Sequence, residues 1–189
     1  MPAYDSNLHH RRTMRLPGYD YAQEGAYFIT ICTHQRACLF GEVTDGEMAL
    51  NEIGKIAQDE WLRSATVRAE VVLDAFCVMP NHLHGVVMIR RDVSAAVVGA
   101  TGRSPLQSER NRVPHACGPG RRSLGALIAG FKAAATRRIN EARSTPGQAI
   151  WQRGYYDRII RDDDELAGIT EYVLGNPRSW TADRENPRS

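Results

Sequence analysis

Two histidines, His82 and His84, lie two positions apart at the start of an apolar, β-rich segment. Side chains at positions i and i+2 of a strand point to the same face of a sheet. The two imidazoles are therefore expected to converge, and the Pro80-Asn81 turn before them fixes where the strand begins. Imidazole is a common ligand of divalent metals, so this spacing indicates a metal site. A pair of packed or surface histidines would have the same spacing.

Two kinds of metal site fit this pair of histidines. A zinc site could recruit His115 and Cys117, a second pair at i and i+2 within a segment rich in proline and glycine. A site for Mg²⁺ or Mn²⁺ over a phosphate needs only the two imidazoles and one oxygen ligand. That oxygen must come from elsewhere in the chain, because no Asp or Glu follows His84 until Asp92.

A tyrosine and an asparagine, Tyr172 and Asn176, lie near the end of the last apolar-periodic segment. A spacing of four stacks two side chains on one face of a helix. The amide oxygen of Asn176 would suit a metal held by two imidazoles, and the Tyr172 phenol would then lie close to that metal. Pro177 disfavours the α conformation at Asn176, so we expect some distortion there. Taken alone, such a tyrosine is more often a half-buried packing residue.

The basic residues are nearly all arginine, since only two of the 24 are lysine. Arginine binds phosphate through a planar fork, although GC-rich codon usage would give the same excess. Between residues 100 and 145, nine Arg or Lys accompany two Glu. This pattern is typical of a phosphate-binding surface or of a solvated helix face. The candidate contacts to nucleic acid are Arg15, Arg121, Arg122, Lys132, Arg137 and Arg153.

Length and composition predict an ordinary globular domain. The 189 residues are 42% hydrophobic and 24% charged, with a net charge of +2. Cys32 and Cys77 lie in apolar segments without C-x-x-C spacing, which is typical of reduced core cysteines. No segment approaches 18 apolar residues, and the basic N-terminus lacks the apolar region of a signal peptide. We therefore expect a cytoplasmic protein with no membrane contact.

Hydrophobic periodicity predicts the elements that position these residues. Strands are expected over 26–33, 71–78, 83–90 and 150–160, and helices over about 51–64, 123–140 and 162–175. The order β-α-β-β-α-β with a terminal helix predicts an α+β fold. Its core would be a ferredoxin-like, split β-α-β antiparallel sheet, the RRM-like palm, and the C-terminal helix would carry Tyr172. We expect a basic arm over 1–25, the domain over 26–180 with a mobile loop at 91–120, and a tail over 181–189.

The chain resembles the HUH single-tyrosine transposases, and most closely the REP-associated tyrosine transposase branch. His82-Leu83-His84 matches the His-hydrophobic-His motif of that superfamily. The matching segments cover most of the chain outside the 91–120 loop and the last ten residues. They are Arg15 to Tyr21, Tyr27 to Thr33, Leu50 to Gly54, Val78 to Gly85, Ser123 to Gly125, Gly130 to Lys132, Trp151 to Arg161, and Tyr172 with Asn176-Pro177.

This resemblance implies a metal-dependent endonuclease and strand-transferase acting on single-stranded DNA. The nucleophile, which forms a 5′-phosphotyrosine, would be Tyr172 rather than Tyr155 or Tyr156. The implied ligands of a Mg or Mn ion are His82, His84 and Asn176.

The resemblance also implies the partners. These are single-stranded or hairpin DNA, including palindromic repeats, and the protein would act as a monomer or homodimer. Many members of the family carry His where this chain has Arg158, which leaves the role of that position open. Two other functions fit the residues: a replication-initiator nickase, and a non-catalytic module that binds single-stranded nucleic acid.

Overall fold

The protein is an α+β structure built on a four-stranded antiparallel sheet, which confirms the predicted fold class. The computed structural model describes residues 19–90, 122–183 and 185–187. The sheet has the order β4-β5-β1-β6, formed by β1 (Gly25–Cys32), β4 (Val71–Met79), β5 (His82–Ile89) and β6 (Tyr156–Ile160). Strand β5 lies between β1 and β4, so the first β-α-β unit is split as predicted.

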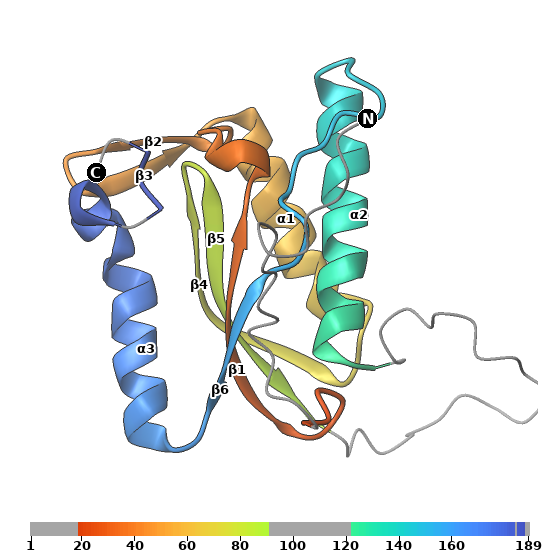
Figure 1. The fold of residues 1–189 in the computed structure, drawn as a ribbon, viewed down its shortest axis with the longest axis vertical. Coiled ribbons are helices and arrows are strands. Elements are labelled where there is room, and N and C mark those ends of the chain that lie inside the picture. Colours follow the sequence, from red (N-terminus) through yellow and green to blue (C-terminus); the bar gives the residue numbers. More distant parts are fainter. Residues whose placement is uncertain (1–18, 91–121, 184, 188–189) are drawn as a thin grey trace, which may run out of the picture.

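Helices cover both faces of this sheet (Figure 1). Helices α1 (Glu52–Thr66) and α2 (Leu124–Ala142) lie side by side on one face, and α3 (Asp163–Gly175) lies on the other. Each helix begins at a polar cap: Asn51, Ser123 and Asp162 each accept a hydrogen bond from a backbone N–H three residues on. None of the described helices is long and apolar enough to cross a membrane.

Alternation along the strands divides the apolar side chains between two cores. Successive residues of a strand point to opposite faces, so Ile29 and Leu83 pack beneath α1 and α2. Phe28 and Val86 point the other way and pack with Val173 of α3. A second, smaller core therefore lies between the sheet and α3. The candidate site lies on this face of the sheet.

Two elements differ from the sequence prediction. A hairpin of β2 (Gly41–Thr44) and β3 (Glu47–Leu50) stands where only a loop was expected. Its strands are four residues long, and Asp45-Gly46 turns with positive φ at both residues, as tight hairpins require. The strand expected over 150–160 starts only at Tyr156, because residues 150–155 make a single bridge, from Trp151 to Thr33.

The chain turns back towards the sheet after α3. It continues directly into a 3-10 helix, η2 (Asn176–Ala182), with Pro177 near its start. Asn176 keeps helical dihedrals (φ −57°, ψ −39°), but its N–H bonds to the Val173 carbonyl three residues back, so the expected distortion is a change from α to 3-10 geometry. Proline is tolerated in the first turn of a helix, where its missing N–H needs no partner. A second short 3-10 helix, η1 (His34–Arg36), follows β1.

Three predicted regions fall partly or wholly outside the described residues. The basic arm over 1–25 is described only from Tyr19, and the 91–120 loop is not described. Within the arm, the rings of Tyr19 and Tyr21 pack against Tyr27 of β1. Of the predicted tail, residues 181–183 and 185–187 are described, and they lie against the candidate site.

Candidate metal centre and nucleophile

His82 and His84 share one face of β5, as their spacing predicts, and that face is the one under α3. Both are buried, with 0% and 3% of their surface exposed. Their ring centroids are 4.4 Å apart. The pair is therefore neither a surface pair nor split between the two faces of the sheet.

The other face of β5 is held against α1 at Gly85. A Cβ at this position would lie 2.8 Å from Cζ2 of Trp61, which is fully buried. Only glycine allows this close approach. The strand segment that carries the two histidines is therefore fixed from behind by the packing of α1.

Hydrogen bonds set the tautomer of His82. Asn81 Nδ2 donates to the backbone carbonyls of Arg36 (3.2 Å) and Glu185 (2.6 Å), so its oxygen faces the ring. The His82 Nδ1 then donates to Asn81 Oδ1 at 2.9 Å. The lone pair of His82 is left on Nε2, the nitrogen that can bind a metal.

His84 is held in a comparable way. Its Nδ1 lies 2.8 Å from Oγ1 of Thr30, its partner in register on β1. The ring of Phe28 stacks on it at a centroid distance of 5.3 Å. Because Nδ1 is engaged by Thr30, Nε2 is the nitrogen that remains for chemistry.

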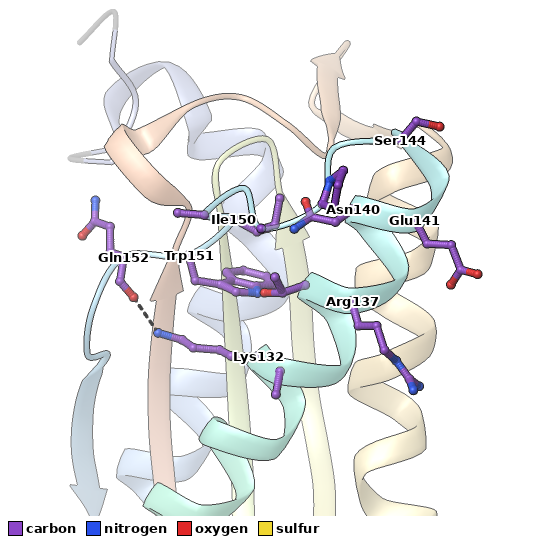
Figure 2. Close-up of a pocket in the computed structure, with 13 residues that line it drawn as sticks. Lys132, Arg137, Asn140, Glu141, Ser144, Ile150, Trp151 and Gln152 are labelled. Atoms are coloured by element: carbon purple, nitrogen blue, oxygen red, sulfur yellow. Dashed lines mark hydrogen bonds between the residues drawn. The ribbon is translucent and has the colours of Figure 1, made fainter.

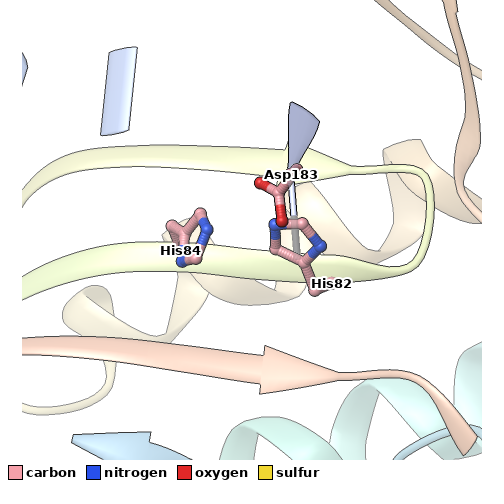
Figure 3. A group of neighbouring side chains, drawn as sticks. All are labelled: His82, His84 and Asp183. Carbon is pink, nitrogen blue, oxygen red and sulfur yellow. The ribbon is translucent and has the colours of Figure 1, made fainter. Parts of the chain in front are cut away.

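An aspartate completes the cluster. One ligand atom from each of His82, His84 and Asp183 lies within 4.8 Å of the others (Figure 3). The Asp183 carboxylate accepts from Asn176 Nδ2 at 3.0 Å and from the backbone N–H of Glu185 at 2.7 Å. Because Asn176 Nδ2 donates to this carboxylate, the Asn176 amide is fixed with its Oδ1 pointing away from Asp183.

Two buried acceptor atoms in this cluster lack a partner. Within the described residues, His82 Nε2 and Asn176 Oδ1 have none in normal hydrogen-bond geometry. Leaving a buried polar atom unpaired costs roughly 1–3 kcal/mol, so such atoms are usually satisfied by something. Both atoms offer lone pairs, and a cation would satisfy both at once. The residues therefore fit a divalent metal.

Burial keeps both rings in the form that binds metals. It is the main cause that lowers the pKa of His84 to about 3, and the neighbouring His82 acts in the same direction. Burial also lowers the pKa of His82, against the opposing charges of Asp183 and Glu185. Both imidazoles are therefore neutral at pH 7, with a lone pair available on each.

Tyr172 stands directly beside the histidine pair. Its hydroxyl lies 3.4 Å from Nε2 of His84, and the two ring centroids are 5.3 Å apart. The residue is 48% exposed, so Tyr172 stands at the surface of the cluster rather than inside it. Of the other two candidate tyrosines, Tyr155 packs into the core under α1 and α2. Tyr156 lies on the same face as Tyr172 but two strands away from His84.

Two of the predicted nucleic-acid contacts lie together at a groove beside α2. Lys132 and Arg137 line a groove of about 1150 Å³ between α2 and the segment 144–152, as Figure 2 shows. Lys132 Nζ donates to the carbonyls of Gln152 and Gly154. Burial lowers the pKa of Lys132 to about 8. Arg122 precedes α2, Arg153 is exposed beyond the groove, and Arg15 and Arg121 lie outside the described residues.

Sequence reasoning did not single out Asp183. It lies seven residues after Asn176 and beyond Pro177, where the last helix was expected to end. Its position depends on η2 turning the chain back. The alternative zinc ligands, His115 and Cys117, lie outside the described residues.

Comparisons with known proteins give a relative and a fold. No family model matches the chain. A curated Haemophilus influenzae protein, described as uncharacterized, is 35% identical over 184 residues, which span 96% of each chain. The solved structure of a REP-associated tyrosine transposase bound to a REP hairpin aligns with 86% of this chain and 72% of its own. Its TM-score is 0.53 and its sequence identity is 14%, so this likeness is one of fold.

Proposed function

This chain belongs to the same family as the Haemophilus influenzae protein, and we propose that it is a transposase-like enzyme that cuts and rejoins single-stranded DNA. The observation that carries the proposal is the Tyr172 hydroxyl 3.4 Å from Nε2 of a buried, neutral His84, on a residue that is 48% exposed. The fold that this chain shares with a REP-associated tyrosine transposase supports it. A module that only binds nucleic acid would have no use for this arrangement.

The metal assigned to the site is Mg²⁺ or Mn²⁺. Its protein ligands are His82 Nε2, His84 Nε2 and Asn176 Oδ1. An amide oxygen beside two imidazoles suits a hard, exchangeable ion better than a structural zinc. When bound, the ion supplies positive charge that polarises the scissile phosphate and favours the phenolate of Tyr172.

The chain's own residues perform the transfer. Tyr172 loses its phenolic proton, and its oxygen forms a bond to the scissile phosphorus. The bond from phosphorus to the 3′ oxygen breaks, and that oxygen takes up a proton. The products are a 5′-phosphotyrosine and a free 3′-OH. One phosphodiester replaces another, so a 3′-OH can reverse the step and join DNA without ATP.

The proposed partner is hairpin DNA formed by palindromic repeats. The solved structure with the same fold is bound to a REP hairpin, which supports this choice. Arg137 at the groove beside α2 and the exposed Arg153 would contact phosphates through the fork geometry of arginine. A replication-initiator nickase would use the same chemistry on a different DNA.

The metal site is tested with His82→Ala and His84→Ala. Each should abolish Mg²⁺- or Mn²⁺-dependent cleavage of single-stranded hairpin DNA, because each removes a ligand. Binding in a gel shift should stay within a few-fold, because phosphate contacts supply most of the affinity. His34→Ala, at an exposed position in η1, is the matched control and should cleave normally. Undiminished cleavage by both site variants would rule out the metal site.

A further inference from the structure

Two large aromatic side chains are exposed among the described residues. Tyr172 is 48% exposed and Tyr156 is 39% exposed. Exposure gives up the hydrophobic stabilisation that a buried ring would provide. The proposed function accounts for the exposure of Tyr172 but leaves that of Tyr156 unexplained.

The two exposed rings share one buried neighbour, Phe28 of β1. The edge contacts of Phe28 have centroid distances of 6.0 Å to Tyr172 and 6.3 Å to Tyr156, with interplanar angles of 80° and 69°. Phe28 also stacks on His84 at 5.3 Å. Tyr156 is therefore part of the same aromatic cluster as the proposed nucleophile, on the same face of the sheet.

Strand register places Tyr156 level with the metal site. Tyr156 on β6 pairs with Thr30 on β1, and Thr30 pairs with His84 on β5. Paired residues of neighbouring strands point to the same face, so all three side chains form one row across the sheet. Two strand spacings separate Tyr156 from His84, about 9–10 Å. A nucleotide adjoining a phosphate held at His84 would reach that far.

The sheet is open at this end of the row. Helix α3 packs over β4 and β5 and also over Ile160 at the far end of β6. Tyr156 begins β6, one of the two edge strands, and is 39% exposed. Two residues beyond Tyr156, Arg158 points to the same face, pairs with Glu165 and keeps 56% of its side chain exposed. Exposed Arg153 and Arg161 flank the strand. An aromatic ring bordered by arginines fits a base and its phosphates.

We propose that Tyr156 is a base-stacking residue, whose ring receives a base of single-stranded DNA next to the phosphate that Tyr172 attacks. The choice of DNA as the ligand rests on the proposed function. Stacking on one tyrosine is tolerant of sequence, because every base presents a π face. Tyr156 would hold the strand across the sheet so that the scissile phosphate lies over His84.

The test compares DNA with and without bases. The probes are a fluorescein-labelled oligothymidylate and an abasic strand of equal length, titrated by fluorescence anisotropy against variants that carry Tyr172→Phe to prevent cleavage. Tyr156→Ala should weaken oligothymidylate binding about tenfold and leave abasic binding unchanged. Tyr156→Phe should restore the affinity, and Tyr156→Leu should not. Leu62→Ala, at an exposed residue of α1, is the control and should bind normally.

Three outcomes would overturn the stacking role. The first is an equal loss of affinity for oligothymidylate and for the abasic strand in Tyr156→Ala. The second is full affinity for oligothymidylate in Tyr156→Leu, and the third is no binding of oligothymidylate by the parent protein. If Tyr156→Ala does not fold, it will show no cooperative thermal unfolding transition. The Phe and Leu variants then still decide the question. Cleavage is measured separately with the wild-type protein. If the wild-type protein cleaves DNA but Tyr156→Ala does not weaken oligothymidylate binding, only the stacking role fails. If stacking is observed without cleavage, only the proposed catalysis fails.

Discussion

At the scale of single residues, the site depends on side chains that fix the histidines in one protonation state. Asn81 fixes the tautomer of His82, and Thr30 engages Nδ1 of His84. Burial then lowers the pKa of both rings. The result is a pair of neutral imidazoles a few ångströms apart, which would repel each other if both were charged.

This low pKa makes the stability of the metal-free protein depend on pH. His84 has a pKa of about 3 when folded and an ordinary value of 6.5. Between these values the unfolded chain binds a proton that the folded chain does not, so the free energy of unfolding falls as the pH falls below 6.5. The slope from one such group is at most about 1.4 kcal/mol per pH unit.

Urea denaturation at a series of pH values, with a chelator present, measures this slope. His84→Gln should flatten it, because glutamine cannot take up a proton. His34→Gln, at an exposed position, should leave it as in the wild type. The explanation is wrong if His84→Gln and the wild type lose stability in parallel.

We expect Asp183 to act by orienting Asn176 rather than as a ligand in its own right, although its carboxylate lies within 4.8 Å of the histidine nitrogens. Both of its oxygens accept hydrogen bonds, whereas Asn176 Oδ1 has no partner in normal hydrogen-bond geometry among the described residues, although the Asn176 side chain acts to raise the pKa of His82. Asp183→Ala should free the Asn176 amide to rotate and weaken Mn²⁺ binding about 10–100-fold. Asp183→Asn keeps an oxygen that can accept from Asn176, so most of the affinity should remain.

Titration of Mn²⁺ by electron paramagnetic resonance distinguishes these roles. Asp163→Asn, in the exposed first turn of α3, is the matched control. Equal losses in Asp183→Asn and Asp183→Ala would mean that the metal needs the Asp183 charge, which makes Asp183 a direct ligand.

At the scale of elements, the contact between β5 and α1 sets where the histidines stand. Gly85→Ala would place a methyl group 2.8 Å from Cζ2 of the Trp61 ring, which is fully buried and has little room to shift. We expect a loss of about 1–3 kcal/mol in the free energy of unfolding, measured by urea denaturation.

Gly168→Ala in α3 is the control for this substitution. A Cβ there would meet nothing within 4 Å, and alanine favours a helix over glycine by about 1 kcal/mol. This variant should therefore be as stable as the wild type or more stable. A neutral effect of Gly85→Ala would show that β5 can move away from α1 without cost.

The elements that sequence predicted well carry strong local signals. The apolar runs of β1, β4 and β5 and the capping residues of the three helices all lie where periodicity and cap chemistry place them. The β2–β3 hairpin was missed because four-residue strands show too little alternation, although Asp45-Gly46 is a tight-turn signal. The start of β6 was misplaced because apolar residues 150 and 151 pack into the core and make only an isolated bridge beside β1.

At the scale of the whole molecule, the candidate site joins parts of the chain that are far apart in sequence. Thr30, His84, Tyr172 and Asp183 come from β1, β5, α3 and the segment after η2. Spacing within one element was enough to identify the histidine pair. The contribution of Asp183 depends on the fold returning the chain after α3, which no local pattern encodes. The contact between α3 and β5 likewise depends on the fold and is not encoded by a local pattern.

The most direct test of the central claim is to trap the covalent intermediate. Wild-type protein incubated with Mg²⁺ or Mn²⁺ and hairpin DNA labelled 3′ of the cut should form an SDS-resistant protein–DNA adduct. Tyr172→Phe should form none while folding normally, because it removes one oxygen and keeps the ring contact with Phe28. Tyr155→Phe and Tyr156→Phe should still form it. Mass spectrometry of the adduct should find the DNA on Tyr172. DNA on Tyr155 or Tyr156, or cleaved product without any adduct, would contradict the account.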